Sequence, residues 1–422
     1  MDVAIVGGGI GGLTLALCLH EAGIACRVYE AVPELKALGV GINIRPHAMQ
    51  VLGRFGIPQE MLKAGNEPRE SVFYSSSGQL IYKHPLSRTA GYDVPHISIH
   101  RGDLHAILVA KVRERLGPEA LCLGHRLTGF TQDDTGVDLH FADSASGAVL
   151  PAVHASVLVG SDGINSAVRK QLYPHEGLPR FGGINMWRGV TRRAPFLDGK
   201  SICRVGALQT GKIVIYPIRN FSDGTQLINW VVEIVMDVNT QNDWATPGHL
   251  ADFIERFAHW HFDWLDIPQM FEQAEMILEY PMVDRDPLPR WSFGRVTLLG
   301  DAAHPMYPRG GNGAAQSILD ANVLPGFLSE HADPVAALQA YDAARVPFTT
   351  RVVNAARNEP PDTIINRVEE ITGGKPFARI EDVIDPQELA AIAQRYAKLT
   401  GYDIETVNRI QAEHARNAPR SA

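Results

Sequence analysis

The residues best suited to chemistry lie in two glycine-rich segments that are far apart in the chain. The first is Gly7–Gly12, with Glu30 downstream, and the second is Gly300–His304, which is followed by Gly310–Gly313. Glycine lets backbone N–H groups approach a phosphate closely, and a carboxylate accepts hydrogen bonds from sugar or polyol hydroxyls. Together these groups favour the binding of a dinucleotide.

The first segment matches the pattern G-x-G-x-x-G between an apolar run and an expected helix. In this pattern Gly7 permits the tight turn, Gly9 lets the backbone approach a pyrophosphate, and Gly12 allows the helix to pack closely on the strand. Glu30 ends the next strand, where its carboxylate can accept both ribose hydroxyls and would repel a 2′-phosphate. The segment therefore predicts FAD or NAD rather than NADP, and the alternative is a glycine turn that binds nothing.

The second segment separates these two nucleotides. Asp301 could hydrogen-bond a polyol such as the ribityl chain of FAD, which NAD lacks. A helix is expected over 312–324, with Gly311 and Gly313 at its N-terminus. The positive end of that helix would stabilise a reduced, anionic flavin. The alternative for Asp301 is a turn or helix-capping residue, and His304 is expected to be a packed structural histidine.

Two further features support the nucleotide interpretation more weakly. Asp162-Gly163 follows an apolar strand pattern and precedes Arg169, but Asp-Gly turns are common in proteins. Arg101 stands at the start of an amphipathic pattern, where it could pair with a pyrophosphate. A surface salt bridge is an equal alternative for Arg101.

The strands and helices that are expected around these residues predict an α/β fold. A Rossmann-like FAD/NAD(P)-binding domain of the GR2 type would contain an inserted antiparallel β-sheet and end in a helical tail. A helix is also expected at Leu250–Phe262. The expected organisation is a discontinuous FAD-binding domain at 1–70, 96–175 and 280–358, a substrate-binding sheet domain at 71–95 and 176–279, and a helical C-terminal segment at 359–422.

Composition excludes several classes of protein. The formal net charge is −8 and basic runs are missing, so a nucleic-acid binder is not expected. The four cysteines show no CxxC spacing, which argues against a disulfide scaffold or a zinc site and favours a reducing cytoplasm. The uncharged start is rich in glycine and lacks a basic leader, so neither a signal peptide nor a membrane span is expected. We expect no metal site, because His259 and His261 do not share a helix face.

The three motifs, in this order, resemble those of the group A flavoprotein monooxygenases, which have the para-hydroxybenzoate hydroxylase fold. The likeness covers roughly residues 1–358. Further stretches are similar to the phenazine, salicylate and 6-hydroxynicotinate hydroxylases of that group: Gly39–Ile44, Ile99–Leu104, Met186–Gly189 and Tyr280–Pro289.

The resemblance implies a set of contacts to tightly bound, non-covalent FAD. Asp162 would serve both FAD and a nicotinamide donor, NADH or NADPH, which binds only transiently. The remaining implied contacts come from side chains or backbone of Gly11, Glu30, Ala31, Arg101, Leu127, Asp301, Gly311, Gly313 and Ala314.

The resemblance also implies a reaction, in which FAD is reduced by NAD(P)H and a flavin C4a-hydroperoxide then hydroxylates an electron-rich ring. The substrate would be an aromatic or N-heteroaromatic small molecule, with or without a carboxylate. One departure concerns Asn43, because hydroxynicotinate-type enzymes have a basic histidine at this position. Asn43 cannot take a proton, so base activation must come from elsewhere or be unnecessary.

The substrate pocket is expected between the inserted sheet and the flavin. Trp187 and Arg188 point to opposite faces of a strand, so at most one simply lines the pocket. Arg45 could receive a substrate carboxylate, although a flavin contact or a solvated face is equally compatible. The catalytic candidates are Tyr216, His47 and Pro308, and the substrate-binding candidates are Asn43, Arg45, Trp187, Arg188, Tyr216, Tyr307, Pro308 and Gly310.

Three classes of function are therefore compared. The leading hypothesis is an FAD-dependent aromatic monooxygenase that uses dioxygen and acts as a monomer or homodimer. The second is a flavin dehydrogenase or reductase with the same fold but without oxygen insertion, and the third is a dinucleotide-binding protein without catalysis. Pro308 and the turn at Gly311–Gly313 favour the first, because they would shape a site beside flavin C4a.

Overall fold

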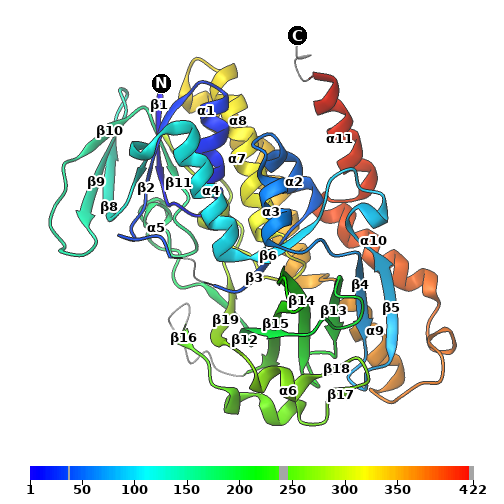
Figure 1. Ribbon diagram of the computed structural model, residues 1–422. Coiled ribbons are helices and arrows are strands. Elements are labelled where there is room, and N and C mark those ends of the chain that lie inside the picture. Colours follow the sequence, from blue (N-terminus) through cyan, green and yellow to red (C-terminus); the bar gives the residue numbers. More distant parts are fainter. Residues whose placement is uncertain (37–38, 237–245, 418–422) are drawn as a thin grey trace.

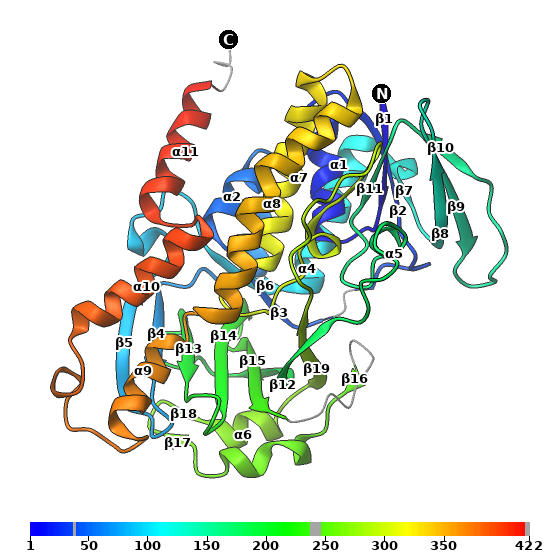
Figure 2. The ribbon, with the colours of Figure 1, turned by 180° about the vertical axis from the view of Figure 1, so that it is seen from behind.

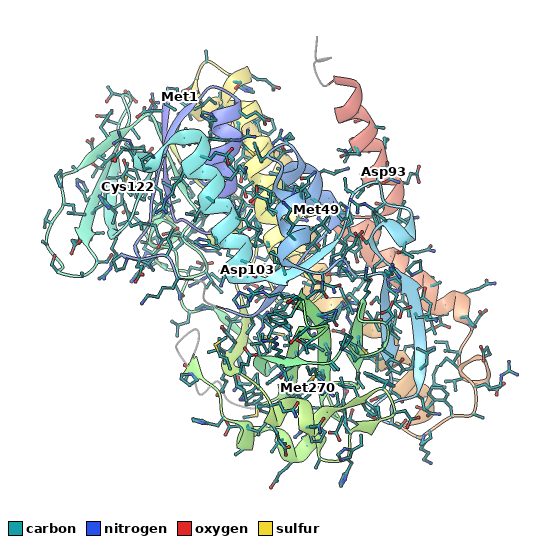
Figure 3. The ribbon with its side chains drawn as sticks, viewed as in Figure 1. Met1, Met49, Asp93, Asp103, Cys122 and Met270 are labelled. Atoms are coloured by element: carbon teal, nitrogen blue, oxygen red, sulfur yellow. The ribbon has the colours of Figure 1, made fainter. Side chains whose placement is uncertain are left out.

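The computed structural model describes residues 1–36, 39–236 and 246–417, so parts of the predicted 176–279 and 359–422 stretches lie outside the described residues. Two layered parts meet along one junction (Figure 1): a parallel sheet with its helices, and a large sheet below it. Asp103, at the start of α4 (Arg101–Leu116), forms an ion pair with Arg219 of the large sheet, and Figure 3 shows Asp103 at this junction.

The first part is built on a five-stranded parallel sheet in the order β20-β11-β1-β2-β7. Its central strands are short and apolar, as expected for strands that are covered on both faces. The predicted βαβ unit is present, because α1 connects β1 to its parallel neighbour β2. The bounds are β1 Asp2–Val6, α1 Ile10–Glu21, β2 Ala25–Tyr29, β7 Leu121–Cys122, β11 Val157–Gly160 and β20 Val296–Leu298.

Helices α4 and α7 both pack on α1 beside this sheet, and α8 packs on α7. A three-stranded antiparallel sheet, in the order β10-β9-β8, lies at the far edge (Figure 1). The remaining bounds in this part are α2 Pro46–Gly53, α3 Ile57–Ala64, β3 Gly41–Ile44, β6 Ile97–His100, β8 His125–Gln132, β9 Val137–Asp143, β10 Val153–Ala155, α5 Ala167–Leu172, α7 Gly313–Glu330 and α8 Pro334–Asn358.

The second part is an eight-stranded sheet in the order β16-β19-β12-β15-β14-β13-β4-β5. The sequence predicts an antiparallel sheet, and most pairs are antiparallel, but β13 and β4 run parallel. The sheet is therefore mixed, because β4 arrives from the first part of the chain. The bounds are β4 Glu70–Tyr74, β5 Leu80–Pro85, β12 Arg180–Arg193, β13 Ser201–Val205, β14 Lys212–Asn220, β15 Gln226–Val235, β16 Thr246–Pro247 and β19 Met276–Asp284.

The helix predicted at Leu250–Phe262 is wrong. Two short 3-10 turns, Leu250–Asp252 and Ile254–Phe257, occupy this stretch, and Phe262 belongs to the small strand β17 (His261–Phe262), which pairs with β18 (Leu265–Asp266). The apolar spacing suited a helix, but it serves an aromatic core beneath the sheet instead. That core contains Phe253, Phe257 and Trp260 from this stretch, together with Trp230 of β15 and Phe271 of the short helix α6 (Ile267–Glu272).

The chain ends in three helices, as the predicted helical tail requires. They are α9 (Thr363–Thr372), α10 (Pro386–Thr400) and α11 (Ile404–Asn417). Seen from behind, α9 lies against β4 and β5, and α10 returns beside the end of α8 (Figure 2). Among the described residues, no helix combines the length and apolarity needed to cross a lipid bilayer.

Candidate active site

One cavity of about 1150 Å³ connects the glycine motifs with the large sheet. This volume exceeds the roughly 300–1,000 Å³ of an ordinary ligand pocket, so it has room for a cofactor together with a substrate. The cofactor candidates that line it are Gly7, Gly9, Gly11, Glu30, Ala31, Arg101, Leu127, Asp162, Asp301, Gly311, Gly313 and Ala314. Sequence positions that are far apart thus meet at one site.

Backbone packing explains the glycines of the first motif. Gly7 has φ +109°, and a Cβ there would lie 2.3 Å from the carbonyl oxygen of Ser161. A Cβ on Gly12 would lie 2.0 Å from the carbonyl oxygen of Gly7, so Gly12 lets α1 start against the turn without facing the cavity. Glu30 accepts the Gly8 N–H at 2.6 Å and the Val32 N–H at 2.9 Å. Its carboxylate is thereby held at the cavity wall.

Replacing Gly12 by Ala should therefore weaken FAD binding sharply. The added methyl group meets backbone rather than a flexible side chain, so the turn after β1 must shift. We expect Gly12→Ala to bind FAD at least about tenfold more weakly, a loss of about 1.4 kcal/mol, and therefore to purify with a lower FAD content than the wild type. Gly326→Ala is the matched variant and should keep the wild-type FAD content, because Gly326 lies within α7, does not line the cavity, and a Cβ there meets no protein atom within 4 Å. Equal FAD content in Gly12→Ala and wild type would contradict this account of the turn.

A buried acid in α7, Asp320, holds the Gly300–His304 turn in place. Asp320 accepts the Gly300 N–H at 3.1 Å and a hydrogen bond from His304 Nε2 at 2.6 Å, and it pairs with Arg345 Nε at 2.7 Å. Burial acts to raise the pKa of Asp320, but Arg345 and His304 outweigh it and hold the pKa below its ordinary value. His304 is a packed histidine, as expected. The turn is held in place by Asp320, which is paired with Arg345.

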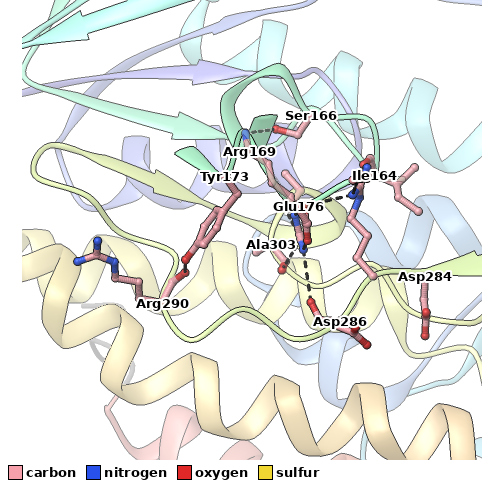
Figure 4. Close-up of polar contacts among 12 residues, drawn as sticks. Ile164, Ser166, Arg169, Tyr173, Glu176, Asp284, Asp286, Arg290 and Ala303 are labelled. Carbon is pink, nitrogen blue, oxygen red and sulfur yellow. Dashed lines mark hydrogen bonds and ion pairs between the residues drawn. The ribbon is translucent and has the colours of Figure 1, made fainter. Parts of the chain in front are cut away.

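A second buried network supports the same turn from the side (Figure 4). Arg169 donates from Nη1 to the carbonyl oxygens of Ala302, at 3.0 Å, and Ala303, at 2.9 Å. Its guanidinium also pairs with Glu176, which in turn pairs with Arg285 at 3.1 Å. The Asp-Gly motif thus leads into the residue that holds the Asp301 turn in place.

Asp162 has a clear structural role within that motif. Its carboxylate accepts the Ser166 hydroxyl at 2.5 Å and the Ala167 N–H at 2.7 Å, at the start of α5. Burial raises the pKa of this carboxyl, and these hydrogen bonds oppose the shift. Asp162 also lines the cavity, so one residue joins the helix start to the candidate cofactor site.

Asp301 is placed to bind a ligand rather than the protein. It lines the cavity, and its carboxylate makes no hydrogen bond with any described residue. Burial raises the pKa of Asp301, whereas His304 and Arg101 act to lower it. A free carboxylate, a glycine cradle and the N-terminus of α7 fit the ribityl, pyrophosphate and ring portions of FAD. The described residues therefore fit FAD.

The substrate side of the cavity is one face of the eight-stranded sheet. Strand register places Arg188, Val231, Val214 and Arg204 opposite one another in a single row across four strands. Three strand spacings separate the two arginines by about 14 Å at the backbone. All four line the cavity, so its floor has two valines between two guanidinium groups.

Tyr216 and Arg188 form a polar corner on this floor. Tyr216 is buried and lines the cavity, and Arg188 hydrogen-bonds its hydroxyl. Burial raises the pKa of Tyr216, while Arg188 acts in the opposite direction. The hydroxyl therefore stays protonated at neutral pH. Arg188 also donates from Nη2 to the Gly41 carbonyl at 2.9 Å, whereas its Nε has no hydrogen-bond partner among the described residues.

Three sequence candidates lie outside the cavity wall. Trp187 points to the opposite face of β12 and packs in the aromatic core against Phe253. Tyr307 packs against the sheet beside Met186, and His47 is buried behind Tyr402, whose ring it stacks on at 5.9 Å. None of these three side chains lines the cavity. The remaining candidates line the cavity: Asn43, Arg45, Arg188, Tyr216, Pro308 and Gly310.

Two histidines near the cavity were not predicted from the sequence. Asn43 Oδ1 accepts the Ser98 hydroxyl at 2.6 Å and lies 3.3 Å from His96 Nε2. Burial lowers the pKa of His96 well below its usual value, and it lowers that of His84 to about 4. Both line the cavity as neutral rings at neutral pH. Neither histidine is a strong base, so neither replaces the basic group that is lacking at Asn43.

These histidines should make the fold sensitive to acid. Burial also lowers the pKa of His47 to about 3, so His47, His84 and His96 all bind protons more readily in the unfolded chain. Their contribution to stability is complete above the unfolded value of about 6.5 and is lost as the pH falls toward the folded values. From about pH 7 to about pH 5.5, the free energy of unfolding should fall by roughly 1 kcal/mol per histidine. Denaturant unfolding of the FAD-bound protein at the two pH values measures this decrease. In His84→Gln the decrease should be smaller by roughly 1 kcal/mol, the part that His84 contributes. Equal stabilities at both pH values would contradict it.

A buried charged cluster was also missed by the sequence analysis. Lys212 Nζ pairs with Glu233 at 2.8 Å and with Asp362 at 2.5 Å, and Arg204 Nε lies 3.5 Å from Asp362. Arg309 Nη2 completes the cluster, 3.8 Å from Glu233. All five residues line the cavity. Only the fold brings them together, since they come from three strands, the flavin-side loop and the C-terminal segment.

Comparison with known proteins identifies the family to which the chain belongs. The model of the FAD binding domain family matches residues 1–356. Phenazine 1,6-dicarboxylic acid hydroxylase from Lysobacter antibioticus is 42% identical, over 93% of this chain and 94% of its own. The 6-hydroxynicotinate 3-monooxygenase of Bordetella bronchiseptica is 32% identical, over 85% of this chain and 93% of its own length.

A solved structure shows the same fold. Klebsiella pneumoniae HpxO, crystallised with FAD and uric acid, superposes with a TM-score of 0.70 at 22% identity, over 99% of this chain and 97% of that one. The two sequence relatives are a hydroxylase and a monooxygenase, which favours oxygen insertion over the dehydrogenase alternative. The chain therefore belongs to the FAD binding domain family and, within it, to the group A flavoprotein monooxygenases, which use FAD, NAD(P)H and dioxygen to hydroxylate aromatic rings.

Proposed function

We propose that this monooxygenase hydroxylates a carboxylated aromatic or N-heteroaromatic ring and that Arg188 binds the substrate carboxylate. Arg188 carries the argument, because it lines the cavity without an acidic partner among the described residues, and its Nε is buried without a hydrogen bond. A buried guanidinium left unpaired is costly, and a bound carboxylate supplies the missing charge and acceptor oxygens.

Charge on the substrate side supports the same substrate class. The cations there are Arg45, Arg188, Arg204, Lys212 and Arg309, against the two acids Glu233 and Asp362. The excess of positive charge in a shielded cavity favours an anion over a neutral molecule. The apolar floor of Val214 and Val231 between Arg188 and Arg204 suits a flat ring.

The residues have separate proposed tasks. FAD is held by the first glycine motif, Glu30, Arg101 and Asp301, and when bound it accepts hydride from NAD(P)H and activates dioxygen for insertion. Tyr216, protonated by virtue of its raised pKa, donates a hydrogen bond to a ring substituent of the substrate. Pro308 forms part of the wall on the flavin side. The enclosing sheet keeps water from the reacting ring.

Location and assembly are also part of the proposal. All four cysteines are free, which is compatible with a reducing cytoplasm. We further propose that the enzyme acts as a monomer or a homodimer.

Matched acids and amides test the proposed substrate class. Phenazine 1,6-dicarboxylic acid and 6-hydroxynicotinate are each compared with the corresponding carboxamide as stimulants of NADH oxidation. We expect at least one acid to stimulate oxidation and to be hydroxylated, with its amide needing about ten times the concentration, because one charge-assisted hydrogen bond is lost. Amides that work as well as the acids would contradict the role of Arg188.

A further inference from the structure

The C-terminal segment, of which the structure describes residues 359–417, lies beyond the part of the chain that the family model matches. It nevertheless forms part of the cavity wall, through Pro361, Asp362, Ile364, Ala393, Tyr396 and Tyr402. A tail that only decorated the fold would not reach the site, so its contacts there require an explanation.

Several anchors hold this segment in place. Asp362 is buried between Lys212 and Arg204, and Ile364 and Leu389 pack in a common apolar cluster with Phe73. The Tyr92 hydroxyl donates to the carbonyl of Tyr402 at 2.5 Å, and Gln50 Nε2 donates to the carbonyl of Val407 at 2.5 Å. The segment is therefore joined to both parts of the fold.

Tyr396 is the residue of this segment that reaches the flavin side. Its side chain is only 2% exposed, and its hydroxyl accepts a hydrogen bond from Asn312 Nδ2 at 2.9 Å and donates to the Arg309 carbonyl at 3.1 Å. Burial raises the pKa of Tyr396, so the hydroxyl keeps the proton that it donates. Both bonds end on the loop that precedes α7.

The shape of that loop matches the tyrosine. Gly310 and Gly311 have φ +77° and +67°, and a Cβ on Gly310 would lie 2.0 Å from the Tyr396 hydroxyl oxygen. Arg45 holds the same loop from the other side, donating from Nε to the Gly310 carbonyl at 3.1 Å, and its guanidinium lies 4.3 Å from the ring centre of Tyr402. The C-terminal segment thus contacts the loop directly and through Arg45.

We propose that Tyr396 is a positioning residue through which the C-terminal segment fixes the Arg309–Asn312 loop between FAD and the substrate. The loop carries the N-terminus of α7 toward the flavin site, and Arg309, Gly310 and Gly311 line the cavity. Its position sets the distance between the ring to be hydroxylated and the activated oxygen. This role rests on the proposed hydroxylation of a carboxylated ring.

Product yield per NADH measures this role. Dioxygen that takes up two electrons and two protons without inserting an oxygen atom leaves as hydrogen peroxide, so a displaced loop converts product into peroxide. In Tyr396→Phe, the Arg309 carbonyl and the Asn312 amide each lose a partner while the ring keeps its volume. We expect the yield of hydroxylated product per NADH to fall by at least about two- to tenfold, the range that the loss of one of these two hydrogen bonds would support alone.

The control is Tyr173→Phe, which removes a hydroxyl that donates to the Arg290 carbonyl at 2.7 Å (Figure 4). Neither Tyr173 nor Arg290 lines the cavity. This variant should keep the wild-type yield. Asn312→Ala removes one of the two bonds and should give an intermediate yield. FAD content and the unfolding midpoint are measured for every variant, so that loss of fold is separated from loss of positioning.

Phenazine 1,6-dicarboxylic acid and 6-hydroxynicotinate serve as test compounds. Failure of the unaltered enzyme to hydroxylate either would count against the proposed substrate class and is seen before any variant is made. A wild-type yield in Tyr396→Phe, at unchanged FAD content, would overturn the positioning role alone. A lower yield in Tyr396→Phe with an unchanged yield in Tyr173→Phe would support it.

Discussion

Asp301→Ala is expected to lose FAD while the protein stays folded. The carboxylate makes no hydrogen bond with the described residues, so its removal breaks no contact that supports the turn. The turn is held by Asp320 and Arg169 instead. A carboxylate that accepts hydroxyls of the ribityl chain contributes about 1.5–3 kcal/mol per hydrogen bond, so the Kd of FAD should rise about 10- to 150-fold.

Titration of the FAD-free protein with FAD, followed by flavin fluorescence, gives this constant. Asp301→Asn is the matched variant, because it keeps the shape and one acceptor oxygen but not the charge, and it should fall between wild type and Asp301→Ala. Far-ultraviolet circular dichroism should be alike for all three. A Kd for FAD that is unchanged in Asp301→Ala would show that the second glycine segment does not bind FAD as we infer.

Arg188→Met should raise the KM for a carboxylated substrate with FAD binding intact. Methionine keeps an apolar stem on the cavity floor but removes the guanidinium that we propose as the carboxylate partner. Losing one charge-assisted contact corresponds to about a 10- to 150-fold rise in KM. The same variant should narrow the difference between the acid and its amide, because the group that distinguishes them is gone.

Arg192→Met is the matched control, since Arg192 lies on the same strand but is exposed and pairs with Asp223 at 2.7 Å. It should leave the KM unchanged. Initial rates of product formation over a range of acid concentrations provide the measurement. If Arg188→Met kept both the wild-type KM and the wild-type preference for the acid, the carboxylate would bind elsewhere in the cavity.

Local patterns predicted the elements around the glycine motifs well. The turn after β1, the helix that begins at Arg101 and the helix after Asn312 all follow from glycine placement and apolar spacing. These features depend on residues close together in the chain, which is why periodicity and turn chemistry reveal them. The meeting of the two glycine segments was predicted from their chemistry, because a shared cofactor explains why both are present.

Long-range packing was not predictable in the same way. Trp187 and Arg188 are neighbours in the chain, and only the assembled sheet shows that Arg188 faces the cavity and Trp187 the aromatic core. Lys212 and Asp362 meet although 149 residues lie between them, and no local pattern marks their pairing. A buried acid in an apolar helix, such as Asp320, is a pattern that could have been used.

The long-range contacts of the C-terminal segment were likewise not predictable from the sequence. Its polar, helical pattern predicted helices, and three are present. Nothing in that pattern indicated that Tyr396 would reach Arg309 and Asn312, because the contact depends on how α10 returns across the end of α8. The cavity is therefore lined by residues inside and outside the stretch that the family model matches.

Incorporation of labelled dioxygen tests the central claim most directly. The purified protein, with bound FAD, is given NADH and phenazine 1,6-dicarboxylic acid or 6-hydroxynicotinate under oxygen-18 gas, and the product is analysed by mass spectrometry. The account predicts one labelled oxygen atom in each product molecule, with NADH and dioxygen consumed together. Products of these acids that form without the label, or NADH oxidation that yields only hydrogen peroxide with both acids, would contradict it.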